Sequence, residues 1–232
     1  MNLELPDHEV RRLRAVAATQ GHFDALVAAR DAGEPLQYLE GSVQFGPVEV
    51  AVDARVLIPR PETEYMFDLA SKAAVAPRVI VDLCTGSGAL ALAMKHVFRD
   101  ARVIGTDNSV AALSVAQSNG TGVEWLQGDL FAALPDDLQG EIDLLVANPP
   151  YVATGEWETL PTDVRREPVE ALVAGPKGTE VVQRILSELE VWMSPGGQGW
   201  VEIGESQGWL GERFGVEVVK DQYGVDRFLR WT

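Results

Sequence analysis

The period of the hydrophobic pattern changes along the chain. Over residues 7–32, apolar side chains recur among charged ones at helical spacing, which predicts two short helices broken near Gly21. From Ser42 to Val52, apolar residues alternate with polar ones around Gly46-Pro47, and this alternation predicts a β-hairpin. A helical segment is therefore expected to precede a hairpin in this part of the chain.

From Arg78 onward, short apolar runs alternate with segments of helical spacing. This alternation predicts right-handed βαβ crossovers and a parallel sheet that helices cover on both faces. The predicted strands are 79–83, 102–106, 123–126 and 142–147, and the predicted helices are 89–98 and 110–118.

The last part of the chain contains two more predicted helices and three more predicted strands. The helices are 179–192 and 207–214, and the strands are 199–203, 216–220 and 227–231. The final two strands are joined through Tyr223-Gly224, a connection too short for a crossover, so they can pair only antiparallel. The predicted fold class is therefore α/β, with a mostly parallel sheet and one antiparallel strand.

The length of 232 residues allows one substantial α/β domain with a small appendage, because a domain of about 150 residues already buries most of its apolar surface. We predict a short helical cap over 1–40 and a β-hairpin linker over 41–58. The main domain is then predicted over 59–232.

Composition and charge narrow the classes of partner. Hydrophobic residues make up 46% of the chain and charged residues 23%, which is typical of a globular protein. The net charge of −16 repels a phosphate backbone, so a protein or small-molecule substrate is favoured over long duplex nucleic acid. A local basic patch could still bind a nucleic acid, so that alternative stays open.

Cysteine usage, histidine spacing and the N-terminal pattern exclude further classes. Cys84 is the single cysteine, which excludes an intrachain disulfide and a cysteine-rich zinc site, and the three histidines lack metal-ligand spacing. Residues 1–7 have neither a basic nor an apolar stretch, and no run approaches the roughly 18 apolar residues that span a bilayer. We therefore expect a cytoplasmic protein without a metal.

A loop with two glycines follows the first strand of the predicted parallel sheet. Residues 82–88 read DLCTGSG, and a helical pattern begins directly after them. Glycines there let a ligand approach the backbone, and the helix start offers free N–H groups to an anion, which in S-adenosylmethionine is the methionine carboxylate. The alternative is a tight turn without a ligand; the full G-x-G-x-x-G pattern of a dinucleotide loop is absent.

Two acidic residues stand at the ends of the next two strands. Asp107 follows Gly88 by close to the roughly 20 residues expected for a carboxylate that accepts hydrogen bonds from ribose hydroxyls. Asp129 ends the third strand, where a carboxylate can accept from the adenine amino group. The alternatives are a helix N-cap at Asp107, ahead of Ser109, and a simple turn at Asp129.

The tetrapeptide Asn148-Pro149-Pro150-Tyr151 directly follows the predicted strand 142–147. In an open α/β sheet this position is the carboxyl edge, where ligands bind. The two prolines fix φ and lack N–H donors, so the loop is stiff and its carbonyl oxygens are free to accept. Among the motifs of the chain, this one indicates a reaction most strongly.

The residue types in this loop suit the methylation of a planar nitrogen. The lone pair of an amide or exocyclic amine is delocalised, so the nitrogen attacks only when its hydrogens are held and its lone pair is aimed. Asn148 and the Pro149 carbonyl can hold them, and Tyr151 can pack on the planar group. Because the sulfonium of the donor already activates the methyl group, positioning in a water-poor pocket supplies most of the acceleration.

From about residue 34 to the C-terminus, the sequence resembles the HemK/PrmC family of protein N5-glutamine methyltransferases. Adenine-N6 and some RNA guanine methyltransferases share the Asn-Pro-Pro-Tyr loop, so the stretch 58–64, IPRPETE, is the discriminating element. The other matching stretches are 35–41, 82–88, 148–151, Glu167-Pro168 with Ala171-Leu172, 202–204 with Gln207, and Asp226-Arg227.

The resemblance implies a Rossmann-like class I methyltransferase sheet and S-adenosylmethionine as the methyl donor. It implies as substrate the glutamine of the Gly-Gly-Gln tripeptide in peptide-chain release factors. Asn148 would contact both donor and glutamine, Pro149 and Tyr151 would act with it in catalysis, and Pro150 would help to shape the substrate pocket. The other residues expected at the donor are Cys84, Thr85, Gly86, Ser87, Gly88, Asp107, Asp129 and Leu130.

Two departures from the family pattern bear on this expectation. Cys84 stands where the family usually has glycine, so a positive φ there would strain the backbone. The segment before the hairpin is much shorter than the family's usual helical domain, which helps to grip the release factor. Glutamine methylation of a protein other than a release factor therefore stays open.

Two rival functions remain at this stage. One is methylation of a nucleic-acid base by the same loop, and the other is a catalytically silent S-adenosylmethionine-binding module, which would lack the loop asparagine. Asn148 is present. Residues 196–198 copy the Gly-Gly-Gln tripeptide, but they follow Pro195 at an expected helix-to-strand turn, and Arg165-Arg166 is more typical of a solvated loop than of a binding site.

Overall fold

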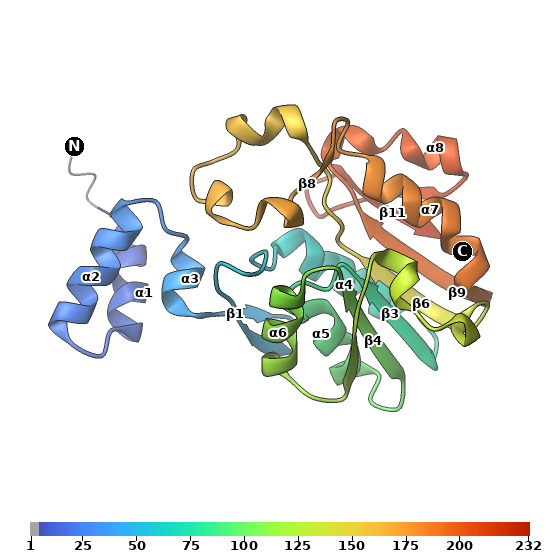
Figure 1. Ribbon diagram of the computed structural model, residues 1–232, viewed down its shortest axis with the longest axis horizontal. Helices are drawn as coiled ribbons and strands as arrows, with labels where there is room; N and C mark the ends of the chain where they lie inside the picture. The colour runs from blue at the N-terminus through green and yellow to red at the C-terminus, as the bar shows by residue number, and fades with distance from the viewer. Residues whose placement is uncertain (1–4) are drawn as a thin grey trace.

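The computed structural model describes residues 5–232 (Figure 1). Its helices are α1 (Asp7–Val16), α2 (Gln20–Asp31), α3 (Leu36–Glu40), α4 (Pro61–Ala73), α5 (Ala89–Val97), α6 (Val110–Asn119), α7 (Glu180–Trp192) and α8 (Leu210–Phe214). Its strands are β1 (Ser42–Phe45), β2 (Val48–Ala51), β3 (Val79–Leu83), β4 (Arg102–Asp107), β5 (Val123–Gln127), β6 (Ile142–Ala147), β7 (Val152–Ala153), β8 (Val173–Gly175), β9 (Met193–Glu202), β10 (Glu217–Lys220) and β11 (Asp226–Trp231).

The central sheet has seven strands in the order β10-β11-β9-β6-β3-β4-β5. Strand β11 runs antiparallel to both of its neighbours, whereas the pairs from β9 to β5 are parallel. The predicted fold class is therefore confirmed, with one reversed strand in a mostly parallel sheet. The strand order changes direction between β3 and β6, and an open α/β sheet binds its ligands beside such a switch point.

The central strands are apolar on both faces because helices cover both. Ile80 and Leu144 lie in one core cluster with side chains from α4, α5 and α6. Their sequence neighbours Val81 and Leu145 lie in another, with side chains from α7 and α8. This is the alternation expected of strands buried in the middle of a layered fold.

Helices α1 to α3 form a small cluster of their own at one end of the molecule (Figure 1). The two predicted short helices are confirmed as α1 and α2, but the break between them lies at residues 17–19, and Gly21 itself lies inside α2. Thr19 starts α2 by accepting a hydrogen bond from the His22 N–H, so the capping residue rather than the glycine sets the boundary. Residues 1–4 of the predicted cap and N-terminal pattern lie outside the described residues.

Strands β1 and β2 pair antiparallel, as predicted for the hairpin. Two later boundaries differ from the prediction. The strand expected over 199–203 begins at Met193, because Gly197 lies against the neighbouring strand, where an added Cβ would be 2.7 Å from the Ile142 carbonyl oxygen. The helix expected over 207–214 is confined to α8, since 205–207 form a separate 3-10 turn.

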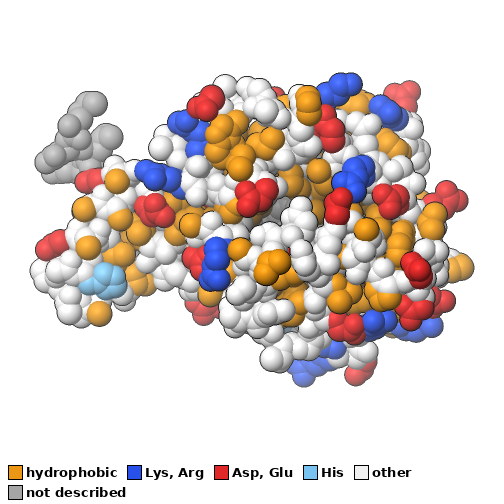
Figure 2. Space-filling model, viewed as in Figure 1, with side chains coloured by type: hydrophobic (Ala, Val, Ile, Leu, Met, Phe, Trp, Pro, Cys, Tyr) orange, Lys and Arg blue, Asp and Glu red, His pale blue; other side chains and the backbone are white. Residues whose placement is uncertain are grey.

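The surface of the molecule mixes the two signs of charge. On the face shown in Figure 2, acidic and basic side chains alternate, so the basic groups visible there do not gather into one patch. Among the described residues, no helix is long and apolar enough to cross a membrane.

Candidate active site

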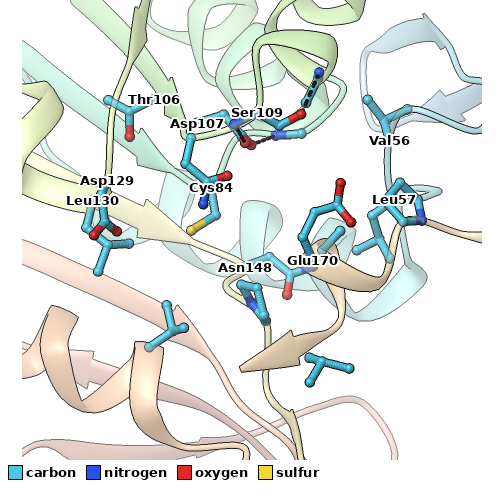
Figure 3. Close-up of a pocket in the computed structure, with 18 of the residues that line it drawn as sticks. Val56, Leu57, Cys84, Thr106, Asp107, Ser109, Asp129, Leu130, Asn148 and Glu170 are labelled. Carbon is cyan, nitrogen blue, oxygen red and sulfur yellow. Dashed lines mark hydrogen bonds between the residues drawn. The ribbon is translucent and has the colours of Figure 1, made fainter. Parts of the chain in front are cut away.

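A cavity of about 360 Å³ lies at the carboxyl ends of β3, β4 and β6 (Figure 3). A smaller cavity of about 50 Å³ adjoins the loop 82–88 and the start of α5. Three predicted site residues, Cys84, Gly86 and Asn148, line both cavities. The larger cavity is also lined by Asp107, Asp129, Leu130 and Pro150, and the smaller one by Thr85 and Ser87.

The loop between β3 and α5 uses three positive φ angles. They are +58° at Cys84, +54° at Gly86 and +81° at Gly88. Cys84 is thus held in a left-handed conformation that disfavours a side chain, as expected if the family's glycine is replaced. Burial raises the pKa of its thiol, so the sulfur stays protonated and is a poor nucleophile.

The two glycines of this loop have different roles. A Cβ added at Gly86 would meet nothing within 4 Å, so the backbone there borders open space. A Cβ added at Gly88 would come within 2.6 Å of the Trp125 ring and 3.0 Å of the Ala116 side chain. Gly86 therefore leaves room for a ligand, whereas Gly88 allows α5 to pack against its neighbours and does not line either cavity.

Asp107 joins the carboxyl ends of β3 and β4. Its Oδ2 accepts from the Gly86 N–H at 2.9 Å and its Oδ1 accepts from the Ser109 N–H at 2.9 Å (Figure 3). Burial raises the pKa of this carboxyl group, and the backbone donors oppose the shift. The N-cap alternative is wrong, because the hydroxyl of Ser109 caps α6 by accepting from Ala112.

Asp129 lies two residues after the end of β5 and is exposed. Its carboxylate accepts from both terminal nitrogens of Arg184 in α7, at 2.8 and 3.2 Å. Leu130, which follows it with a φ of +53°, is buried and lines the larger cavity. The predicted adenine contact of Asp129 would therefore use a carboxylate that already carries an ion pair.

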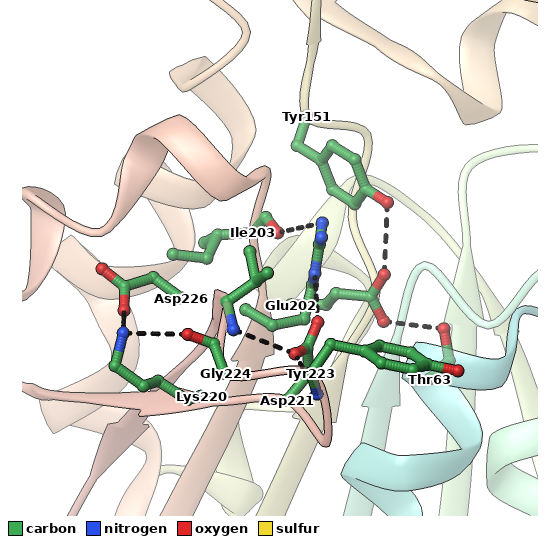
Figure 4. Close-up of polar contacts among 11 residues, drawn as sticks. Thr63, Tyr151, Glu202, Ile203, Lys220, Asp221, Tyr223, Gly224 and Asp226 are labelled. Carbon is green, nitrogen blue, oxygen red and sulfur yellow. Dashed lines mark hydrogen bonds and ion pairs between the residues drawn. The ribbon is translucent and has the colours of Figure 1, made fainter.

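The tetrapeptide 148–151 begins where β6 ends, and its first residue is hydrogen-bonded to a residue of α4. The Asn148 Nδ2 donates to Thr63 Oγ1 at 2.9 Å, and Thr63 Oγ1 donates to Glu202 Oε2 at 2.7 Å. Tyr151 donates its hydroxyl hydrogen to the other carboxylate oxygen at 3.2 Å (Figure 4). The predicted packing of Tyr151 on a planar substrate group stays a prediction.

Thr63 and Glu202 were not predicted as site residues. Both lie in stretches that carry the family resemblance, 58–64 and 202–204. The sequence therefore marked these stretches as matching the family but did not indicate what Thr63 and Glu202 do. Glu202 is 1% exposed, and burial raises the pKa of its carboxyl group to about 7. The hydrogen bonds from Thr63 and Tyr151 and the charge of Arg227 oppose that shift, and Glu62 adds to it.

Another buried carboxylate holds the loop 82–88 in shape. Asp82 accepts from the Thr85 hydroxyl at 2.6 Å and from the Ala91 N–H at 3.1 Å. Burial raises the pKa of Asp82 to about 7, although both donors favour the charged form. The Thr85 hydroxyl is thus bonded to Asp82 at the start of the loop. Its predicted contact with S-adenosylmethionine would therefore use the backbone of Thr85.

Glu167 connects two segments that border the site. It is buried, accepts from the Ile58 N–H at 2.9 Å, and forms an ion pair with Arg60. Arg60 precedes α4, and Glu167 lies in the long connection between β7 and β8. Sequence reasoning placed both residues in the family pattern and assigned neither a role.

No metal centre is formed by the part of the chain that the structure describes, since no group of three or more His, Cys, Asp or Glu side chains there could hold an ion. The parallel strands β3, β4 and β6 bring the loop 82–88, called the donor loop below, to one edge of the sheet together with Asp107 and the tetrapeptide 148–151. Sequence reasoning predicted that juxtaposition.

The chain is similar to known methyltransferases. Residues 65–191 match the family described as Methyltransferase small domain. A release factor glutamine methyltransferase of Mycolicibacterium smegmatis is 45% identical over 185 residues, covering 78% of this chain and 65% of that protein, which is just under two thirds of its length. One from Deinococcus radiodurans is 37% identical over 222 residues, covering 88% of this chain and 76% of that protein.

The fold recurs in a methyltransferase from Pyrococcus furiosus. The two structures superimpose with a TM-score of 0.57 at 16% identity, covering 91% of this chain and 95% of the other. At that identity the likeness shows the fold alone.

Proposed function

The chain belongs to the family of release factor glutamine methyltransferases, and we propose that it transfers a methyl group from S-adenosylmethionine to the side-chain amide nitrogen of a protein glutamine. The proposed substrate is the glutamine of the Gly-Gly-Gln tripeptide in peptide-chain release factors. We further propose that the reaction takes place in the cytoplasm. The names of the relatives and the tetrapeptide 148–151 support the substrate class.

The residues around the two cavities suit the two halves of the donor. Asp107 has lone pairs left for ribose hydroxyls after its two backbone bonds, and Leu130 offers an apolar wall to the adenine. The smaller cavity is lined by Ser87 and Ala89 at the start of α5, where unpaired N–H groups and the helix dipole favour a carboxylate. Adenosine therefore fits the larger cavity and the methionine end the smaller one.

One observation carries the proposal: Asn148 lines both cavities. In S-adenosylmethionine the sulfonium joins the adenosyl and methionine halves and bears the methyl group. A residue at the junction of the two cavities would therefore lie beside the methyl group. Asn148 can hold the reacting amide there, because its side chain has both a donor and an acceptor.

In this proposal the protein orients the two reactants and excludes water from them, and no side chain acts as a general acid or base. When bound, S-adenosylmethionine supplies an electrophilic methyl group: the glutamine nitrogen gains it, the sulfur keeps the electron pair of the broken bond, and one amide proton leaves to solvent. Asn148 and the Pro149 carbonyl would hold the amide hydrogens so that the lone pair faces the methyl carbon. Holding two reactants in line can supply about 7–11 kcal/mol of the barrier reduction in favourable cases.

A labelling experiment tests the proposal directly. Purified protein is given methyl-labelled S-adenosylmethionine with a release factor, the same release factor with its Gly-Gly-Gln glutamine changed to alanine, tRNA, rRNA and DNA. We expect label on the intact release factor and none on the altered one. Label on nucleic acid alone would contradict the proposal and favour base methylation.

A further inference from the structure

Glu202 has no place in either cavity wall yet is connected to Asn148 through one intervening residue. It lies at the end of β9, lines neither cavity, and is 1% exposed. Both of its carboxylate oxygens accept hydrogen bonds from hydroxyl groups, one from Thr63 and one from Tyr151 (Figure 4). Thr63 is also buried and touches Asn148. A chain of hydrogen bonds therefore runs from β9 through α4 to the tetrapeptide.

The direction of these hydrogen bonds follows from the chemistry of the groups. An ionised carboxylate only accepts, so the Thr63 hydroxyl must spend its single hydrogen on Glu202, at 2.7 Å. The Thr63 oxygen can then only accept from Asn148, which stands 2.9 Å away. Asn148 must therefore present its NH₂ group to Thr63, and its Oδ1 remains free to accept a hydrogen.

We propose that Glu202 is a positioning residue that acts through Thr63 to fix which end of the Asn148 amide faces the substrate nitrogen. This inference rests on the proposed function. A glutamine amide must have its hydrogens accepted, so Oδ1 is the productive end and the NH₂ group is not. Because the same carboxylate also holds the Tyr151 hydroxyl, one buried charge orders both ends of the tetrapeptide.

Protonation of Glu202 reverses the relay. A protonated carboxyl group can donate to Thr63, whose hydroxyl is then free to donate to Asn148 and favours the opposite amide orientation. The charged or titratable groups that act on Glu202 are Tyr151 after β6, Arg227 in β11 and Glu62 in α4. Because burial raises the pKa of Glu202 to about 7, the reversal falls in the neutral range and catalysis is lost as the pH decreases.

A matched pair of variants isolates the relay. Thr63→Val keeps the shape of the side chain and removes the hydroxyl, whereas Thr63→Ser keeps the hydroxyl. We expect kcat for glutamine methylation to fall about 100-fold in Thr63→Val, as when one aligned hydrogen-bond partner is lost from an active site, and to recover most of that loss in Thr63→Ser. The loss in kcat should exceed any change in the affinity for S-adenosylmethionine, measured by calorimetry on the same variants, because Thr63 lines the smaller cavity but spends its hydrogen bonds on Glu202 and Asn148.

The pH profile and Glu202→Gln test the carboxylate. In the unsubstituted protein, kcat should rise with pH through an apparent pKa near 7 and then level off. Glu202→Gln should lower the plateau and abolish this limb, because glutamine does not ionise. Equal kcat in Thr63→Val and Thr63→Ser, or an unchanged limb in Glu202→Gln, would overturn the proposal.

A spectroscopic measurement separates this inference from the proposed function. The side-chain NH₂ resonances of Asn148 are followed by ¹⁵N NMR in the unsubstituted protein, in Thr63→Ser and in Thr63→Val, without any acceptor. Slow solvent exchange that is lost only in Thr63→Val supports the relay even if no glutamine is methylated. Identical exchange in all three proteins would disprove it, even if the chain methylates release factors.

Discussion

At the scale of single residues, the site is shaped by acidic side chains that accept hydrogens from neighbouring groups. Asp82 holds Thr85, Asp107 holds the Gly86 N–H, and Glu202 holds Thr63 and Tyr151. The first two bonds join residues that line a cavity, whereas Glu202 lies outside both cavities and holds the tetrapeptide from behind.

Asp107→Ala should weaken donor binding. The change removes the bonds to Gly86 and Ser109 and the acceptor for the ribose, and the loss of a charged hydrogen-bond partner costs about 1.5–3 kcal/mol, or roughly 10-fold to 150-fold in Kd. Calorimetric titration with S-adenosylhomocysteine measures it. Asp100→Ala is the control, since Asp100 is exposed and precedes β4 at the opposite edge. Equal dissociation constants in the two variants would remove Asp107 from the site.

Cys84 stores backbone strain that a glycine would release. Its φ of +58° costs a residue with a side chain about 1–2 kcal/mol. Cys84→Gly and Cys84→Ala both remove the thiol, so their comparison isolates the conformational term. We expect Cys84→Gly to have the larger free energy of unfolding in urea, by about 1 kcal/mol. A more stable Cys84→Ala would mean that the loop is not strained at this position.

Sequence alone predicted the residues that stand next to each other in a motif. The tetrapeptide 148–151 and the loop 82–88 were found because their residue types and their places after apolar strands are both readable. Glu202 was missed because its partners Thr63 and Tyr151 are far away in the chain, and a hydrogen bond of that kind leaves no local pattern. The Arg184 partner of Asp129 was missed for the same reason.

At the scale of elements, the site depends on how separate segments are joined at the carboxyl edge of the sheet. The connection between β7 and β8 is tied to the start of α4 by Glu167, which contacts Ile58 and Arg60. Arg166 in the same connection donates to the Ala32 carbonyl oxygen after α2. The residue that follows α2 therefore contacts the segment that borders the site.

Breaking the Glu167 bonds should loosen that connection. In Glu167→Ala, the Ile58 N–H and the Arg60 guanidinium lose their acceptor; because the Arg60 side chain is 27% exposed and can be solvated, we expect a cost of about 1.5–3 kcal/mol. Relative to the unsubstituted protein, we expect the backbone amides of residues 152–175 to exchange faster in Glu167→Ala. The exchange of the amides in β3 and β6 should change less. Glu170→Ala, an exposed neighbour, is the control. An equal change in exchange rate across the whole chain would show that Glu167 has no local role.

Element boundaries followed the sequence where a local signal sets them and departed where packing does. The antiparallel end of the sheet was predicted because the link through Tyr223-Gly224 is too short for a crossover. The early start of β9 was missed because Gly197 fits against Ile142, a contact that the local pattern does not encode.

At the scale of the whole molecule, the parallel sheet places every predicted motif at one edge. Strands β3, β4 and β6 are neighbours, so their carboxyl ends bring the donor loop, Asp107 and the tetrapeptide together although they are distant in sequence. The mixed charges visible in Figure 2 and the net charge of −16 fit a protein substrate better than a nucleic acid. The fold was predictable because the alternation of strand and helix periods in the hydrophobic pattern determines the layers. The hydrogen bonds from Glu202 through Thr63 to Asn148 join residues that are distant in sequence, so only the structure shows them.

We propose that Asn148 orients the substrate amide beside the methyl group. Single-turnover methylation of a release factor, with the donor Kd measured on the same samples, tests it most directly in the unsubstituted protein and in Asn148→Ala. We expect methyl transfer to fall at least about 100-fold in Asn148→Ala while the donor Kd changes by less than about threefold, because one aligned hydrogen-bond partner is removed. A parallel loss of donor binding and methyl transfer, or full activity in Asn148→Ala, would show that Asn148 does not orient the substrate amide.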